Sequence, residues 1–366
     1  MLDWVKLHET AWTQIQVDRA RGRLSHALLI SGPAGIGKLQ FAEMLADSLL
    51  CDTPLSDGRA CGVCTACTWQ ASGNHPDFRR IRPEAFEAPV VDVESDKPAS
   101  TGKADRKKSE QIRIDQVRGL ESFIHVGSHR GCRVVLIEPA EAMNEATANA
   151  LLKSLEEPPA GVHFLLVSHA AERLLPTVRS RTRAVPLGVP CRQAALQVLA
   201  GLTPPLHDGA RWLSRCAGAL RFAIELASAA EKRPDATEDA LAEVALVDAL
   251  FSQLMLGPRL DPLALAKSCE ALVKGDLSGT RLALLIDWMQ RWALDLHLVR
   301  LGADPVVFPE QLSGFQKLAG QLNDAHLSHY PDALLEARRL SSHPLNIRLF
   351  LEALFSKTLA LYEPGP

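Results

Sequence analysis

Residues 32–38, with the sequence GPAGIGK, constrain the fold of this 366-residue chain more than any other segment. They follow a short apolar run at 27–30 and precede a helical pattern with an apolar stripe on one face. In this setting glycines let backbone N–H groups wrap a phosphate, the helix N-terminus adds positive potential, and the lysine reaches the outer phosphates. The sequence therefore predicts a P-loop fold, whose candidate nucleotide-binding residues are Gly32, Gly35, Gly37 and Lys38.

The rest of the first 187 residues has the pattern of a parallel α/β sheet. Apolar runs at 134–137 and 164–167 are separated from the first run by helical segments, as expected for βαβ units. One helix is well delimited, because Asn144 can cap its start and Pro158 follows its end. An insertion at about 84–108 is rich in Pro, Ser, Asp and Lys and lacks periodicity, so we expect a mobile surface loop there.

Beyond about residue 190 the sequence shows no convincing strand pattern. Residues 188–235 predict a small helical domain, and residues 236–366 predict several further helices. One of these helices has a dense apolar surface, formed by Leu282, Leu284, Leu285, Trp288, Trp292 and Leu296. This surface fits either the core of the domain or packing against another subunit, and the pattern alone does not distinguish the two.

Composition limits the classes of function. The formal net charge is −3 and the pI is about 6.5, which argues against a nucleic-acid binder that acts alone. The first residues show no secretory pattern and the apolar runs are too short to span a bilayer, so we expect a cytoplasmic protein with no membrane partner. Its eight cysteines should then be reduced, and clustered ones are interpreted as metal ligands before disulfides.

Four of these cysteines form a cluster, since Cys51, Cys61, Cys64 and Cys67 lie within 17 residues with C-x9-C-x2-C-x2-C spacing. Thiolates at this spacing can surround one ion tetrahedrally, and four protein ligands leave no position for water. We therefore predict a structural zinc ion. The alternatives are four unrelated thiols, a disulfide pair in an oxidising compartment, or an iron–sulfur cluster. The nearby His75 is interpreted as a hydrogen-bonding loop residue rather than a fifth ligand.

Two losses distinguish this chain from a working P-loop ATPase. Leu39 stands where a Ser or Thr hydroxyl holds Mg²⁺, and leucine cannot ligate a hard cation. Glu138 and Pro139 follow the buried run at 133–137, at positions where such ATPases place Asp and then Glu. Proline cannot act as a base. Hydrolysis is then not the task of this chain. Weak nucleotide binding through Lys38 and a merely structural turn both remain open.

The motifs occur in an order that resembles a known family. After the phosphate loop and the four cysteines come residues 149–159 (NALLKSLEEPP), residues 164–168 (FLLVS) and Ser180-Arg181. This order resembles the clamp-loader subunits of bacterial DNA polymerase III, which are AAA+ proteins, and the resemblance covers about the first 230 residues. It implies an AAA+ P-loop domain with a zinc module at 1–187, a helical lid domain at 188–235 and a helical collar domain for oligomerisation at 236–366.

Within that family two kinds of subunit have the zinc module. The motor kind, gamma/tau, has an intact phosphate loop and an Asp-Glu pair, whereas a non-motor kind has degenerate versions of both. Leu39 and Pro139 place this sequence with the non-motor kind, and the intact Lys38 is a departure toward the motor.

The same resemblance assigns Arg181 to a role in trans. The family has a Ser-Arg-Cys motif whose arginine reaches the ATP of a neighbouring subunit, and Ser180-Arg181-Thr182 matches it except at Thr182. A permanently charged, forked donor suits the charge that develops on a γ-phosphate. The neighbouring Arg179 and Arg183 could equally be chosen, and a surface arginine with a local partner is the alternative interpretation.

By the same resemblance Ser168 and Arg221 occupy the two sensor positions of a nucleotide site. The implied function is a non-motor subunit that helps load the sliding clamp onto primed DNA within the DNA polymerase III complex, which as a whole is a nucleotidyltransferase. The implied partners in this hetero-oligomer are gamma/tau, delta, the beta sliding clamp and primer–template DNA. The alternatives are an active gamma/tau-like ATPase and a zinc-stabilised scaffold outside replication.

Overall fold

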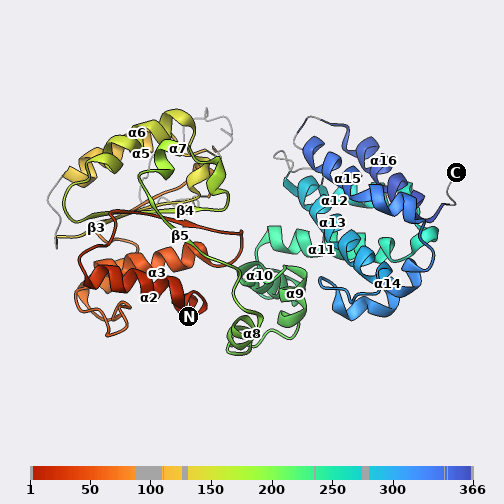
Figure 1. The fold of residues 1–366 in the computed structure, drawn as a ribbon, viewed down its shortest axis with the longest axis horizontal. Helices are drawn as coiled ribbons and strands as arrows, with labels where there is room; N and C mark the ends of the chain where they lie inside the picture. The colour runs from red at the N-terminus through yellow and green to blue at the C-terminus, as the bar shows by residue number, and fades with distance from the viewer. Residues whose placement is uncertain are drawn as a thin grey trace, which may run out of the picture. The chain divides into compact units, whose positions relative to one another are not determined.

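A five-stranded parallel sheet forms the centre of the first of two units, Met1–Cys191, in the computed structural model (Figure 1). The structure describes residues 3–86, 109, 111–125, 131–234, 236–273, 280–341, 343 and 345–363. Within these ranges the strand order is β2-β3-β4-β1-β5. The strands are β1 (Ala27–Ser31), β2 (Phe78–Ile81), β3 (Arg133–Ile137), β4 (Val162–Ser168) and β5 (Arg183–Pro186).

The sheet buries both of its faces, which explains the continuous apolar runs of its central strands. All five residues of β3 are buried, and β1 is buried except at Ser31. In the register of β1 with β4, Leu29 lies opposite Leu166 and Ser31 lies opposite Ser168. Because the strands are parallel, their carboxyl ends meet at one edge of the sheet, and the 32–37 loop begins there.

Helices cover the two faces of this sheet, with α2 and α3 on one side and α5 and α6 on the other (Figure 1). The helices of the unit are α1 (Trp4–Leu7), α2 (Glu9–Ala20), α3 (Lys38–Leu50), α4 (Thr65–Ala71), α5 (Ile114–His125), α6 (Glu145–Glu156) and α7 (Pro176–Arg179), with short turns η1 (Glu84–Phe86), η2 (Ala140–Ala142) and η3 (Ala171–Arg173). Side chains alternate between two cores, so that Leu28 and Ile30 pack with Phe41 of α3, while Leu29 packs with Leu151 of α6.

Helix α6 begins and ends as the sequence predicts. The Asn144 side chain accepts a hydrogen bond from the Thr147 N–H and caps its first turn, and the helix ends at Glu156 before Pro158. The first three residues of the expected insertion at 84–108 form η1. Residues 87–108 of this insertion lie outside the described residues.

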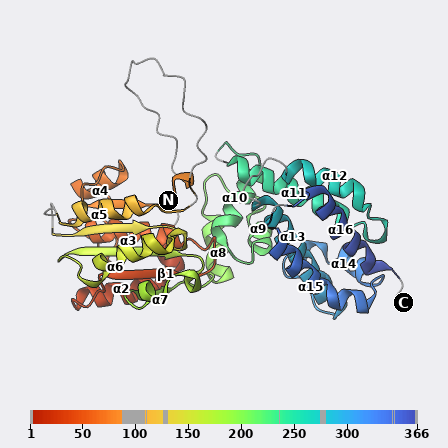
Figure 2. The same cartoon turned by 90° about the horizontal axis from the view of Figure 1, so that it is seen from above.

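The second unit, Arg192–Pro366, contains helices and no strand in the part that the structure describes (Figures 1 and 2). Its elements are α8 (Arg192–Ala200), α9 (Gly209–Arg215), α10 (Leu220–Ala230), α11 (Glu238–Leu254), η4 (Gly257–Arg259), α12 (Pro262–Val273), α13 (Thr280–Arg300), η5 (Pro309–Gln311), α14 (Leu312–Ala319), α15 (Asp324–Leu340), α16 (Ile347–Leu359) and η6 (Ala360–Tyr362). The fold class predicted from the sequence is confirmed, while a further division near residue 235 stays a prediction.

The apolar surface of α13 lies in the core of its own unit. Trp288 and Trp292 are almost completely buried, and Trp288 contacts the rings of Trp212 and Phe308. The interpretation as a domain core therefore holds for these aromatic side chains. Among the described residues, no helix combines the length and the apolar character needed to cross a membrane.

The first helix packs directly on the phosphate loop. Gly37 has a φ of +89°, and a Cβ at this position would overlap the ring of the buried Trp4. Gly37 therefore meets two demands that only glycine satisfies, a left-handed backbone and the close approach of an aromatic ring.

We predict that Gly37→Ala lowers the free energy of unfolding by about 2–4 kcal/mol, because it adds overpacking to left-handed strain. The control is Gly22→Ala, at a φ of +65° with no heavy atom within 4 Å of the added Cβ. It should cost about 1 kcal/mol. Urea unfolding of the two variants measures the difference, and equal losses would show that the Trp4 contact contributes nothing.

Candidate phosphate-loop site and metal centre

The 32–37 loop has the backbone of a phosphate loop. Gly32, Gly35 and Gly37 all have positive φ, at 147°, 76° and 89°. A Cβ on Gly32 would overlap the carbonyl oxygen of Leu187, so the end of β5 also packs against the loop. The glycines are therefore required by the geometry of the turn, whether or not it holds a phosphate.

Lys38 points back into its own loop. Its Nζ donates hydrogen bonds to the carbonyl oxygens of Gly32, at 2.7 Å, and of Pro33. The residue is only 2% exposed, and this burial lowers the pKa of Lys38 from 10.5 to about 8, against the opposing charge of Glu141. The amine that should reach a phosphate is thus held by the loop itself.

The residues present do not fit a magnesium ion. Leu39 packs against the core under α3 and offers no oxygen. Glu138, the acid that follows β3, is 16% exposed at its side chain, and its Oε1 accepts hydrogen bonds from Nε and Nη2 of Arg80 at 2.9 and 2.5 Å. Nη1 of Arg80 also donates to Oε1 of Glu43 at 2.9 Å. Arg80 is not among the residues predicted for this site, because it lies in strand β2, which the sequence pattern does not predict.

Other polar groups gather at the same edge of the sheet. Ser168 is fully buried at the end of β4, and its Oγ accepts a hydrogen bond from the Ala170 N–H at 3.2 Å. Oε1 of Glu141 accepts from the His169 N–H at 2.9 Å, while its buried Oε2 has no hydrogen-bond partner among the described residues. Burial, followed by the charge of Lys38, lowers the pKa of His169. The expected first sensor residue therefore lies beside the loop.

The other expected sensor residue belongs to the second unit. Arg221 is exposed on α10, where its Nε lies 3.9 Å from Oε2 of Glu225, one turn along the helix. A contact of Arg221 with a nucleotide stays a prediction.

Arg181 follows α7 and is held by local contacts. Its Nη1 donates to the Thr177 carbonyl oxygen at 3.0 Å, and its Nη2 lies 2.5 Å from Oε1 of Glu156. Arg183 differs, because its Nη2 pairs at 2.6 Å with Asp18, whose side chain is only 12% exposed. Arg183 is thus tied to a largely buried carboxylate, whereas the partner of Arg181, Glu156, is 48% exposed at its side chain.

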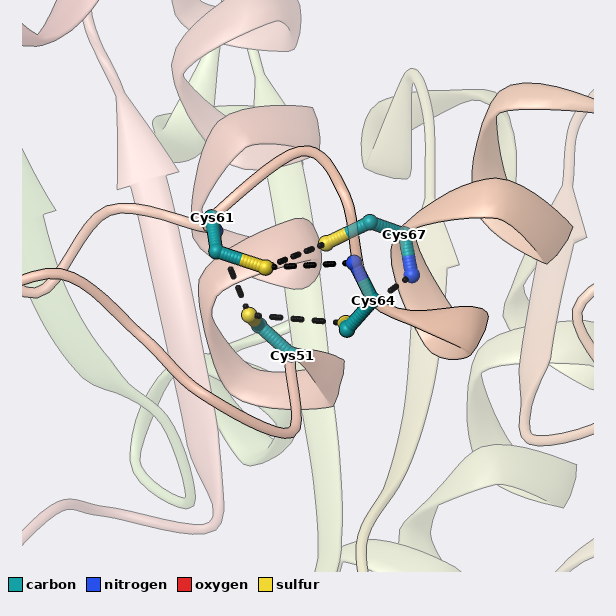
Figure 3. Close-up of side chains that lie close together, drawn as sticks. All are labelled: Cys51, Cys61, Cys64 and Cys67. Carbon is teal, nitrogen blue, oxygen red and sulfur yellow. Dashed lines mark hydrogen bonds between the residues drawn. The ribbon is translucent and has the colours of Figure 1, made fainter.

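The four clustered cysteines come together between α3 and α4 (Figure 3). Cys51 caps the end of α3, and Cys64 caps the start of α4. All four sulfur atoms lie within 4.8 Å of one another, with Sγ–Sγ distances of 3.9 Å for Cys51–Cys64 and 4.0 Å for Cys61–Cys67. A tetrahedral ion with about 2.3 Å bonds to sulfur needs edges of about 3.8 Å.

Backbone N–H groups point at these sulfur atoms, as thiolates require. Cys61 N–H donates to Sγ of Cys51, Cys64 N–H to Sγ of Cys61, and Cys67 N–H to Sγ of Cys64, at 3.3–3.4 Å. The hydrogen bond with the Thr53 side chain is the main cause that lowers the pKa of Cys61 to about 6. None of the four is in a disulfide, so together they can hold a metal ion.

His75 is not part of this group. It is buried, and its Nδ1 accepts a hydrogen bond from the Asp77 N–H at 3.1 Å, as expected for a loop histidine.

This fold and this site define a P-loop protein of the AAA+ type with a four-cysteine module and a phosphate loop that does not fit a metal. Residues 7–190 match the family model described as DNA polymerase III, delta subunit. The DNA polymerase III subunit delta′ of Pseudomonas aeruginosa is 33% identical over 384 aligned positions, which cover 100% of both chains. The chain belongs to this delta′ family of clamp-loader subunits.

Two further similarities are to proteins named for the gamma subunit. DNA polymerase III subunit gamma/tau of Mycobacterium bovis is 34% identical over 180 residues, which are 49% of this chain and 27% of that protein. The crystal structure of a DNA polymerase III gamma subunit-related protein from Thermotoga maritima aligns with a TM-score of 0.53 at 16% identity, over 96% of this chain and 100% of that one. The second similarity supports the fold alone.

We predict about one metal ion per purified chain, bound through four thiolates. Cys64→Ser removes a ligand that also caps α4, so its metal content should fall toward zero after treatment with a chelator that leaves the wild type loaded. Elemental analysis measures this. The control Cys191→Ser changes an exposed cysteine outside the cluster and should keep the ion. Equal metal content in the two variants would contradict the site.

Lys38 provides a pH test. Its folded pKa of about 8 lies below the unfolded value of 10.5, so between these values the unfolded chain binds more protons and stability rises with pH. The free energy of unfolding of the wild type, relative to Lys38→Met, should therefore increase between about pH 7.5 and about pH 9.5. Urea unfolding at the two pH values measures it, and a constant difference would mean that Lys38 is not desolvated.

Proposed function

We propose that this chain is a non-motor clamp-loader subunit that helps load a ring-shaped sliding clamp onto primed DNA and offers Arg181 to the ATP site of a neighbouring subunit. The observation that supports this most directly is that the chain's own nucleotide site lacks groups for hydrolysis, whereas Arg181 is present and partly exposed. On the chain's own site, the partly buried Leu39 packs against the core and Glu138 is paired with Arg80. Both functions that hydrolysis needs, a metal ligand and a free acid, are therefore compromised.

Arg181 suits a role in trans because its present contacts can be exchanged. Its side chain is 35% exposed, and its partner Glu156 is more exposed still. Exposed ion pairs of this kind contribute only about 0–1 kcal/mol, so a phosphate could replace the carboxylate. The fork of the guanidinium then faces the charge that develops on the transferred phosphoryl group. Arg183 would have to leave the largely buried Asp18, which makes it the weaker candidate.

The proposed partners are gamma/tau, delta, the beta clamp and primer–template DNA within the assembled complex. A net charge of −3 suits a subunit that shares DNA with other chains and contacts phosphates without reading bases. We further propose that the ion in the cysteine cluster is zinc, with a structural role, since four protein thiolates leave no position for a reacting water. The cytoplasmic location stays a prediction.

Arg181→Ala in the reconstituted clamp loader should lower DNA-stimulated ATP turnover by roughly tenfold or more at the interface that it serves. The isolated wild-type chain should show no turnover. Arg179→Ala changes an exposed arginine at the end of α7, two residues before Arg181, and should leave turnover unchanged.

Unchanged turnover with Arg181→Ala would refute its role. Robust hydrolysis by the isolated chain would instead favour an active gamma/tau-like ATPase, the alternative that the intact Lys38 keeps open.

A further inference from the structure

Arg80 connects three elements at the carboxyl edge of the sheet. It lies in the edge strand β2, opposite Leu136 of β3. Its guanidinium donates two hydrogen bonds to Glu138, directly after β3, and a third to Glu43 of α3. The side chains of Arg80 and Glu138 are both largely shielded from solvent. One planar cation therefore joins two carboxylates from different elements, and all three of its nitrogen atoms are engaged.

The two carboxylates need a cation between them. Glu43 and Glu138 both bind the same guanidinium, and without it two like charges would share a partly desolvated site. In a working P-loop site the acid after the third strand is a ligand of Mg²⁺. Here two N–H groups of the guanidinium, on Nε and Nη2, occupy Oε1 of Glu138, an oxygen that such an ion would otherwise bind.

Two other charged side chains at this edge of the sheet, Lys38 and Glu141, contact groups other than Arg80. Lys38 is directed at loop carbonyl oxygens, and burial keeps its pKa low. Glu141 accepts a hydrogen bond from the His169 N–H, and its charge acts on Lys38. Leu39 stands at the position that should supply a hydroxyl, and its partly buried side chain packs against the core. Arg80 is thus the cation that neutralises the acid after β3.

We propose that Arg80 is an internal counter-ion that replaces a divalent metal ion at Glu138 and closes the phosphate-loop site to such ions. This inference goes beyond the proposed function, because it concerns the chain's own site and does not depend on Arg181. It implies that removal of the guanidinium leaves a pair of carboxylates able to bind an oxygen-preferring divalent cation.

The strand itself supplies a matched control. Arg79 is adjacent to Arg80 but points to the opposite face of β2, where its guanidinium lies 5.3 Å from the centre of the Phe123 ring. Arg79→Ala therefore removes the same charge from the same strand without uncovering Glu138. Comparison of the two variants separates the loss of one positive charge from the loss of this particular ion pair.

Mn²⁺ is the probe, because it prefers oxygen ligands and its binding is followed by the electron paramagnetic resonance signal of the free ion. The full chain, with zinc saturating its cysteine cluster, is titrated with Mn²⁺. We expect Arg80→Ala to bind Mn²⁺ roughly tenfold or more tightly than the wild type and Arg79→Ala. Adding Glu138→Gln to Arg80→Ala should abolish the gain. The unfolding temperature of Arg80→Ala alone should rise when Mn²⁺ is added.

Two results would overturn the proposal. One is that folded Arg80→Ala binds Mn²⁺ no better than the wild type. The other is that the wild type already binds Mn²⁺ in a way that Glu138→Gln removes. If Arg80→Ala does not fold, Arg80→Met keeps the aliphatic stem and serves in the same titration with the same two criteria.

Discussion

The parallel pairing of β1 with β4 is the constraint on which the rest of the first unit depends. It fixes Ser31 opposite Ser168, so the phosphate loop and the first sensor position must lie at one edge of the sheet. Parallel pairing also requires a crossover connection between neighbouring strands, and α3 and α6 pack on opposite faces of the sheet. The end of β5 completes this edge, since Leu187 donates its N–H to the Ser31 carbonyl oxygen at 2.7 Å and its own carbonyl approaches Gly32.

At this edge, internal contacts stand where ligands of a working site would be. Lys38 binds carbonyl oxygens of its own loop, Leu39 packs against the core, and Glu138 pairs with Arg80. The contacts of Lys38 and Glu138 satisfy charged groups that would otherwise be costly to bury without a ligand. The shape of a P-loop domain is therefore stable without the chemistry that the shape usually serves.

Features that are local in the sequence could be predicted from it. The phosphate loop, the Asn144 cap and the close approach of the four cysteines each depend on residues near one another along the chain. Strand β2 could not be predicted, because residues 78–81 read FRRI, and two arginines in four residues hide the apolar pattern of a strand. Its pairing with β3 is also what brings Arg80 to Glu138, 58 positions away in the chain. The roles of Lys38, Ser168, Arg181 and Arg221 toward nucleotides stay predictions.

Arg80 and Arg181 show why residue type alone does not define a role. Both are arginines paired with a glutamate at 2.5 Å. Arg80 is held by a strand end and a helix at once, in a partly desolvated place where screening by salt is weak, so its removal leaves two carboxylates facing each other. Arg181 is held by neighbours on α6 and α7 at a more exposed place, where water or another anion can take over each bond. The geometry of Arg80 suits a cation that remains in its ion pair, and the geometry of Arg181 suits a cation that can exchange its partner for a group of another chain.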